Sequence, residues 1–163
     1  MTIDSVYPCT EYLTFGPWIY LVPQIEPQSV LMLGYAQGTV AGLMRRLYGY
    51  GFPITAVDKA DPEHADEYHV DFVRADAEQY VEVAAWHEVL IVDLWVYDPP
   101  PFVFTAWFVS AVTARCDYLI VHRMDYSDMS AYRHLHKVRT LGLDYGARFD
   151  YFMVNRVARL PVR

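Results

Sequence analysis

The sequence predicts one α/β domain of the doubly wound kind, with a mostly parallel sheet covered by helices on both faces. Short apolar runs alternate with segments of helical periodicity along most of the chain. The runs are nearly continuous in apolar residues, as expected for strands that are buried on both faces. The 163 residues fit one ordinary domain, and 54% apolar residues are ample for one continuous core.

In the first half of the chain we expect strands at Val30–Gly34, Ile54–Asp58 and Val70–Ala75. Between the first two, Thr39–Tyr48 carries apolar residues at helical spacing and is followed by glycines that end a helix. The polar segment 59–69 is expected to hold a short helix at most, and 77–86 reads as a helix.

In the second half, VLIVDLW at 89–95 is the clearest buried strand, and DPPP at 98–101 must be a loop. An apolar helix is expected at 102–115 and a fifth strand at 118–123. Ser127 is expected to cap a helix that runs to about Leu141. Two closing strands, 149–154 and 157–162, are expected to be antiparallel. Residues 1–26 are expected to form a short hairpin segment, so that 27–163 make up the domain.

Composition excludes several classes of protein. A formal charge of −7, from 20 acidic and 13 basic residues, argues against a nucleic-acid binder, which needs a basic face. The same charge suits a cationic small substrate, although many soluble proteins are acidic. The 2 cysteines form no CxxC pair, and neither a metal site nor a disulfide framework is expected. With no signal peptide or membrane span recognisable, we expect a cytoplasmic protein that does not enter membranes.

Candidate ligand-binding residues follow the strands, because open parallel sheets bind ligands beyond the carboxyl ends of their strands. The first strand leads into Gly34-Tyr35-Ala36-Gln37-Gly38-Thr39. Glycines there permit a tight turn and close approach of a ligand, and the next helix offers N–H groups to an anionic group. An ordinary strand-to-helix turn explains this motif alone equally well.

Acidic residues follow the next three strands. Asp58 has the spacing from the glycine turn that suits a carboxylate accepting hydrogen bonds from both ribose hydroxyls. Asp76, followed by Ala77, either faces an adenine amino group or caps the next helix. Asp93 stands in an apolar strand, where a carboxylate is costly unless it is paired or functional, and Asp98 is a candidate assistant in the proline loop.

Taken together, these stretches resemble spermidine synthases and spermidine synthase-like proteins, the aminopropyltransferase relatives of class I S-adenosylmethionine-dependent methyltransferases. The resemblance extends from about Pro27 to the C-terminus, where Asn155-Arg156-Val157 resembles the closing strand. The stretches that carry it are VLMLGYAQGTVAGLM, ITAVDKADP, VRADAEQYV and VLIVDLWVYDPPPFVFTAWF. It implies a Rossmann-like fold and an adenosyl co-substrate, either S-adenosylmethionine or its decarboxylated form.

The resemblance also implies roles for individual residues. Tyr35 and Gln37 lie within the glycine turn, where Gly34 and Gly38 would cradle the methionine-derived part of the ligand. Asp58 would hold the ribose and Asp76-Ala77 the adenine. Asp93, with Asp98 nearby, would deprotonate an attacking amine such as a polyamine. A homo-oligomer is expected because aromatic residues are abundant and because the N-terminal domain, which in these relatives mediates assembly, is reduced here to about 25 residues.

Three functions remain open at this point: aminopropyl transfer to an amine, methyl transfer to a small molecule, and non-catalytic binding or oligomerisation. The last is favoured by Ala36, by Gln37, which replaces an acidic residue of true spermidine synthases, and by the short N-terminal segment. The retained carboxylates oppose it. Arg45-Arg46 are expected on a solvated helix face. His122 follows the fifth strand and either reaches the pocket or, as we favour, lies in the core or on the surface.

Overall fold

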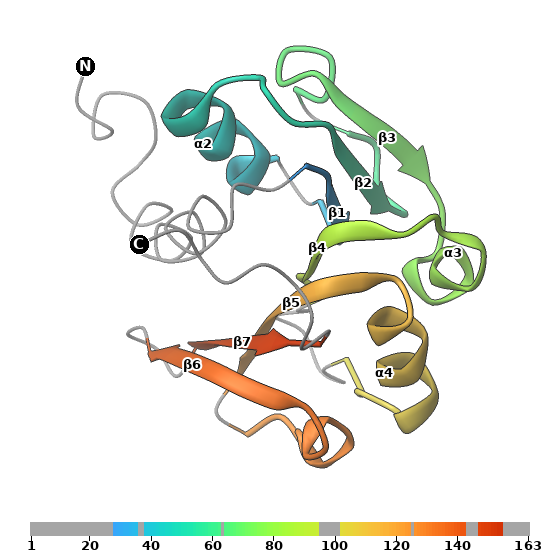
Figure 1. Ribbon diagram of the computed structural model, residues 1–163. Helices are drawn as coiled ribbons and strands as arrows, with labels where there is room; N and C mark the ends of the chain where they lie inside the picture. The colour runs from blue at the N-terminus through green and yellow to red at the C-terminus, as the bar shows by residue number, and fades with distance from the viewer. Residues whose placement is uncertain are drawn as a thin grey trace.

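The computed structural model describes residues 28–35, 38–62, 64–94, 102–124, 126–142 and 147–154. Within these ranges, seven strands form one sheet in the order β3-β2-β1-β4-β5-β7-β6 (Figure 1). The strands are β1 (Val30–Leu33), β2 (Ile54–Asp58), β3 (Val70–Arg74), β4 (His87–Val92), β5 (Cys116–Met124), β6 (His136–Gly142) and β7 (Ala147–Met153). The helices are α2 (Thr39–Tyr48), α3 (Ala77–Val83), α4 (Ala106–Thr113) and the 3₁₀ turn η3 (Ser130–Tyr132).

The sheet reverses its strand order between β1 and β4. Strands β3, β2, β1, β4 and β5 are parallel, with Val30 of β1 paired to Ile54 on one side and to Val89 on the other. The chain first proceeds outward from β1 to β3 and then returns to β4, next to β1. The carboxyl ends of β1 and β4 therefore flank a topological switch point, where such sheets bind ligands.

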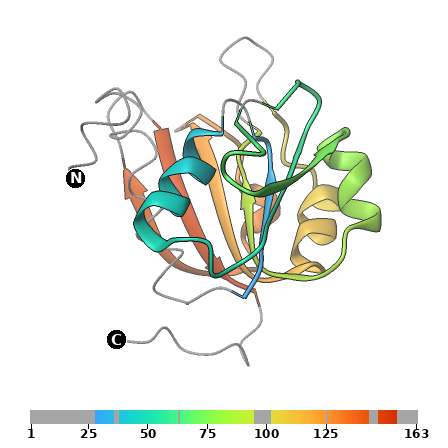
Figure 2. The same ribbon diagram turned by 90° about the horizontal axis from the view of Figure 1, so that it is seen from above.

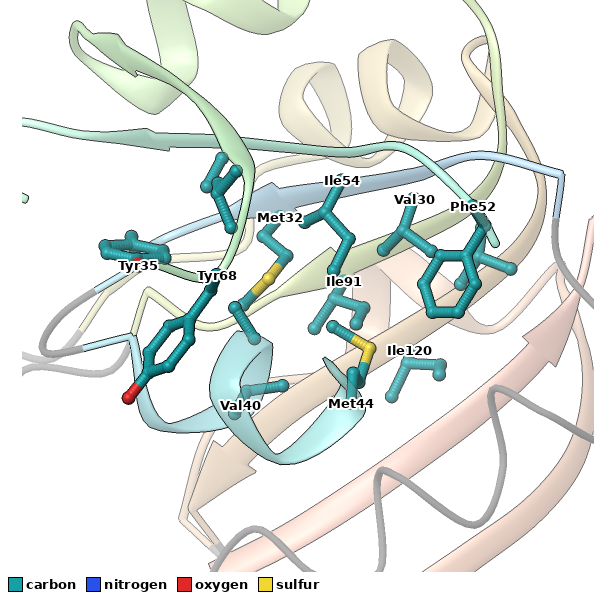
Figure 3. Packing of buried hydrophobic residues seen from close by; sticks show 14 of the residues in the cluster. Val30, Met32, Tyr35, Val40, Met44, Phe52, Ile54, Tyr68, Ile91 and Ile120 are labelled. Atoms are coloured by element: carbon teal, nitrogen blue, oxygen red, sulfur yellow. The ribbon is translucent and has the colours of Figure 1, made fainter. Parts of the chain in front are cut away.

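Helices cover both faces of the sheet, with α2 on one side and α3 and α4 on the other (Figure 2). Alternate strand residues point to opposite faces, which explains two separate apolar clusters. Under α2, residues such as Met32, Ile91 and Met44 pack together (Figure 3). Under α3 and α4, residues such as Leu33 and Phe108 do the same. The predicted doubly wound, mostly parallel α/β fold is thus confirmed.

One predicted element is wrong. The helix expected from Ser127 to about Leu141 is replaced by η3 and the edge strand β6, which pairs antiparallel with β7. Ser127 caps no helix, because its hydroxyl accepts a hydrogen bond from the backbone N–H of Met124 at 3.1 Å. β-Branched Val138 and Thr140 also favour the strand. The expected hairpin in 1–26 and the strand at 157–162 lie outside the described residues.

Arg45 is also not on a solvated face, as the sequence had suggested, but is only 4% exposed. Its guanidinium donates three hydrogen bonds to backbone carbonyls, those of Tyr68 (2.7 Å), Phe52 (2.7 Å) and His69 (2.9 Å). Two of these bonds fasten the end of the segment between β2 and β3 to α2, and the third fastens Phe52, just before β2. The described residues of that segment form turns and no helix.

We expect Arg45→Met to lower the free energy of unfolding by about 3 kcal/mol. The reason is that the buried carbonyls of Tyr68 and Phe52 would lose their hydrogen-bond donor. Urea denaturation followed by circular dichroism measures this loss. The exposed Arg133 provides the control, since Arg133→Met should change stability by less than about 0.5 kcal/mol. Equal stability of the two variants would show that water replaces the guanidinium without cost.

Candidate functional site

A cavity of about 310 Å³ opens at the carboxyl ends of β2, β3 and β4. Its volume falls in the range of small-molecule sites, at the position in the sheet where such sites are expected. The described residues that line it are Val57, Asp58, Lys59, Ala75, Asp76, Ala77, Glu78, Asp93, Leu94 and Phe102. Four of the predicted site residues, Asp58, Asp76, Ala77 and Asp93, are therefore brought together around one space.

Asp58 ties the ends of β1 and β2 together. One carboxylate oxygen, Oδ2, accepts a hydrogen bond from the backbone N–H of Tyr35 at 2.8 Å, and Oδ1 accepts one from Ala60 at 3.0 Å. The N–H of Gly34 in turn donates to the carbonyl of Val57 at 2.8 Å. The carboxylate is consequently fixed by the main chain at the rim of the cavity.

The glycine turn brings the main chain of β1 close to that of β4. Gly34 has a φ of +92°, and a Cβ at this position would lie 2.1 Å from the carbonyl oxygen of Asp93. Gly38 has a φ of 75° and precedes α2. Gly34 and Gly38 are not among the described residues that line the cavity. Gly34 does lie directly beside Asp93, which is one of the lining residues. Gln37, predicted to contact the ligand, and Asp98, predicted to assist catalysis, lie outside the described residues.

Tyr35 contributes its main chain to this region and its side chain to the core. Tyr35 is 3% exposed, and its side chain lies in the cluster under α2 (Figure 3). Its ring contacts that of Phe72 edge-on, at 5.5 Å between the ring centroids. Burial, together with the nearby Tyr68 and Glu67, raises the pKa of Tyr35 to about 12. The part of Tyr35 that points toward the site is therefore its backbone N–H.

Asp76 adopts the capping geometry that was one of its two expected roles. Its Oδ1 accepts hydrogen bonds from the backbone N–H groups of Glu78 (2.8 Å) and Gln79 (3.3 Å), at the start of α3. Its Oδ2 forms an ion pair with Lys59, the residue that follows Asp58. The hydrogen bond from Lys59 lowers the pKa of Asp76, against the opposing effect of partial burial, and the backbone donors lower it further.

Asp93 is paired with His122, for which a place in the core or on the surface was preferred over one at the pocket. The imidazole Nδ1 lies 2.8 Å from Oδ1 of Asp93. The side chain of His122 is fully buried, whereas that of Asp93 is 13% exposed. The signal that could have revealed this pair is the register: Val92 pairs with Val121, so the next residue on each parallel strand is a neighbour of the other.

The charged groups that line the cavity are mostly acidic. Among its described lining residues, Asp58, Asp76, Glu78 and Asp93 are acidic, and Lys59 is basic. No three acidic, histidine or cysteine side chains in the described part of the chain are grouped so that they could hold a metal ion. By its charge, this lining favours a cationic ligand over an anionic one. In the same described residues, no helix is long and apolar enough to cross a membrane.

No protein-family model and no curated protein matches the chain. Solved structures are similar to it at low identity. A SAM dependent methyltransferase from Aquifex aeolicus has a TM-score of 0.65 at 11% identity, covering 94% of this chain and 97% of that one. Human methyltransferase-like protein 13 in complex with SAH has a TM-score of 0.61 at 14% identity, covering 93% and 81%.

A mutant of MtNAS in complex with S-adenosylmethionine has a TM-score of 0.62 at 12% identity, covering 93% of this chain and 64% of that one. None of the three is described as a spermidine synthase. The strand order, the helices on both faces and these similarities together show that the chain has the Rossmann-like fold of class I S-adenosylmethionine-dependent methyltransferases.

Proposed function

We propose that the protein binds S-adenosylmethionine in the cavity at the carboxyl edge of the sheet and transfers its methyl group to a small-molecule acceptor. The observation that carries this proposal is the convergence of Asp58, Asp76 and Asp93, from three separate strands, on one cavity. The presence of SAH and of S-adenosylmethionine in two structures of similar fold supports it.

The order of the strands suggests how the ligand lies. Moving across the sheet from β3 to β2 and β4, the cavity offers Asp76-Ala77, Asp58 and Asp93 in turn. Gly34, at the end of β1, lies beside Asp93. In the proposed pose the adenine lies at the start of α3, and the ribose hydroxyls donate to Asp58. The sulfonium then lies near the turn after β1, where the carboxylates favour its positive charge. Its methyl group points toward β4.

Asp93 is the group proposed to accept a proton. Bound S-adenosylmethionine supplies an electrophilic methyl carbon. As the acceptor's lone pair forms a bond to this carbon, the carbon–sulfur bond breaks and its electron pair stays on the sulfur. An acceptor amine or hydroxyl loses a proton in this step, and the cavity-lining carboxylate of Asp93 is placed to take it.

Aminopropyl transfer from decarboxylated S-adenosylmethionine is the second candidate. The acidic lining favours it, because a cationic amine is attracted to carboxylates. The first candidate is preferred because α2 begins directly after the turn that follows β1, so that its N–H groups suit the carboxylate that only S-adenosylmethionine carries. Calorimetric titration with both donors and with S-adenosylhomocysteine decides between them.

Asp58→Ala should weaken the binding of S-adenosylhomocysteine about tenfold to a hundredfold, as expected for the loss of charge-assisted hydrogen bonds to the ribose. Isothermal titration calorimetry measures the affinity. Because Asp58 also holds two backbone N–H groups, thermal melting of the same sample establishes that the variant is folded.

The control is Asp71→Ala, at an exposed position early in β3, which should leave the affinity unchanged. Equal affinities of wild type and Asp58→Ala would refute the assignment of Asp58 to the ribose. A protein that binds the ligand but turns over no acceptor with either donor would instead be a binding module.

A further inference from the structure

We propose that His122 is a positioning residue: it holds Oδ1 of Asp93 so that the other carboxylate oxygen faces the group that the donor transfers. This inference rests on the proposed function and adds a residue and a geometry to it. It begins from the 2.8 Å contact between Nδ1 of His122 and Oδ1 of Asp93.

The proposal requires a particular tautomer of His122, with a proton on Nδ1. An ionised carboxylate only accepts hydrogen bonds, so the imidazole must donate, and its proton must be on Nδ1. The bond restrains the carboxylate, because β5 holds the imidazole beside the end of β4, where Val92 pairs with Val121. One oxygen of Asp93 is thereby occupied and the direction of the second is set.

The burial of the two side chains separates their roles. His122 has no exposed side-chain surface, so it is not placed to touch a ligand in the cavity. Asp93 is 13% exposed and lines the cavity, so its carboxylate is placed to contact a ligand there. A well-packed apolar pair at such a position is often at least as stable as a buried polar pair. Stability alone therefore does not explain why histidine and aspartate are paired here, whereas the need to orient the carboxylate does.

The position of Asp93 in the sheet places its carboxylate near the proposed position of the transferred group. Its carbonyl oxygen packs against Gly34 at the end of β1, and its N–H donates to the carbonyl of Leu33 at 2.8 Å. In the proposed pose this is the side toward which the transferred methyl group points. Sinefungin tests this placement, because a carbon replaces the sulfur of S-adenosylmethionine in it and a protonated amine takes the place of the transferred methyl group.

The experiment compares the affinities of sinefungin and S-adenosylhomocysteine by calorimetry in four proteins: wild type, Asp93→Asn, His122→Leu and His122→Asn. Leucine and asparagine branch at the same carbon, but only asparagine offers a donor near the place of Nδ1. We expect wild type to prefer sinefungin, and Asp93→Asn to lose about tenfold of that preference, as for one charge-assisted hydrogen bond. His122→Leu should lose part of it, and His122→Asn should retain it.

The affinity for S-adenosylhomocysteine should stay the same in all four, because this ligand has nothing at the transfer position. A merely structural role of His122 would instead change both affinities alike. If wild type does not bind S-adenosylhomocysteine, the proposed function fails and this inference fails with it. If the ligand binds but the preference is the same in wild type, Asp93→Asn and His122→Leu, only this inference is overturned.

The tautomer of His122 can be measured in the unliganded wild-type protein, so this second test does not depend on the folding of any variant. Nitrogen-15 spectra that correlate the imidazole nitrogens with the ring protons distinguish the two neutral tautomers. A proton on Nδ1 of His122 is expected. A neutral imidazole with its proton on Nε2 would overturn the inference, because Nδ1 would then have no hydrogen to donate.

Discussion

Gly34→Ala is expected to be among the most destabilising single substitutions in this protein, lowering the free energy of unfolding by about 4 kcal/mol or more. A Cβ at this position would lie 2.1 Å from the carbonyl oxygen of Asp93 and 2.8 Å from its carbonyl carbon. Both are main-chain atoms of the neighbouring strand segment, so no side-chain rotation relieves the overlap. The φ of +92° adds strain that a residue with a Cβ rarely accepts.

Two glycines offer matched controls. Gly49 also has a positive φ, +73°, but a Cβ there meets no atom within 4 Å, so that Gly49→Ala should cost only the conformational strain, about 1–2 kcal/mol. Gly51 meets no atom either, and Gly51→Ala should be close to neutral. Urea denaturation of the three variants separates overlap from strain. A Gly34→Ala protein as stable as Gly49→Ala would show that the end of β1 is free to move away from β4.

Much of this fold is local in origin, which is why the sequence predicts it. The runs VLML of β1 and VLIV of β4 are too short and too uniformly apolar for surface helices, and the structure buries every residue of both. The mixed end of the sheet is different. β6 is an edge strand in which Val138 is exposed, and its conformation depends on pairing with β7. A pattern within the chain does not reveal such a partner.

The candidate site also has a part that the sequence predicts and a part that it does not. Asp58, Asp76 and Asp93 each follow a strand, and parallel strands place their carboxyl ends at one edge, so their convergence was foreseeable. The contacts among residues were not. The pairing of His122 with Asp93 depends on the register of β4 and β5, and that of Lys59 with Asp76 depends on the turn after β2. The roles of all these residues toward a ligand remain predictions.

Asp93→Asn should lower the rate of group transfer about 10²- to 10⁴-fold, the usual contribution of a positioned general base. The amide keeps an oxygen that can accept the hydrogen bond from His122, so packing and the binding of S-adenosylhomocysteine should change little. An amide neither takes a proton at neutral pH nor attracts a cationic acceptor as a carboxylate does. The affinity should therefore persist while turnover is lost.

The assay measures transfer from S-adenosylmethionine and from its decarboxylated form to a panel of amines and hydroxyl compounds. Asp71→Asn, the same chemical change at an exposed position in β3, should retain the full rate. Transfer from the decarboxylated donor alone would replace methyl transfer by aminopropyl transfer, with Asp93 in the same role. Full activity of Asp93→Asn with either donor would mean that the acceptor's proton leaves by another route. The Asp93–His122 pair would then serve chiefly to join the ends of β4 and β5.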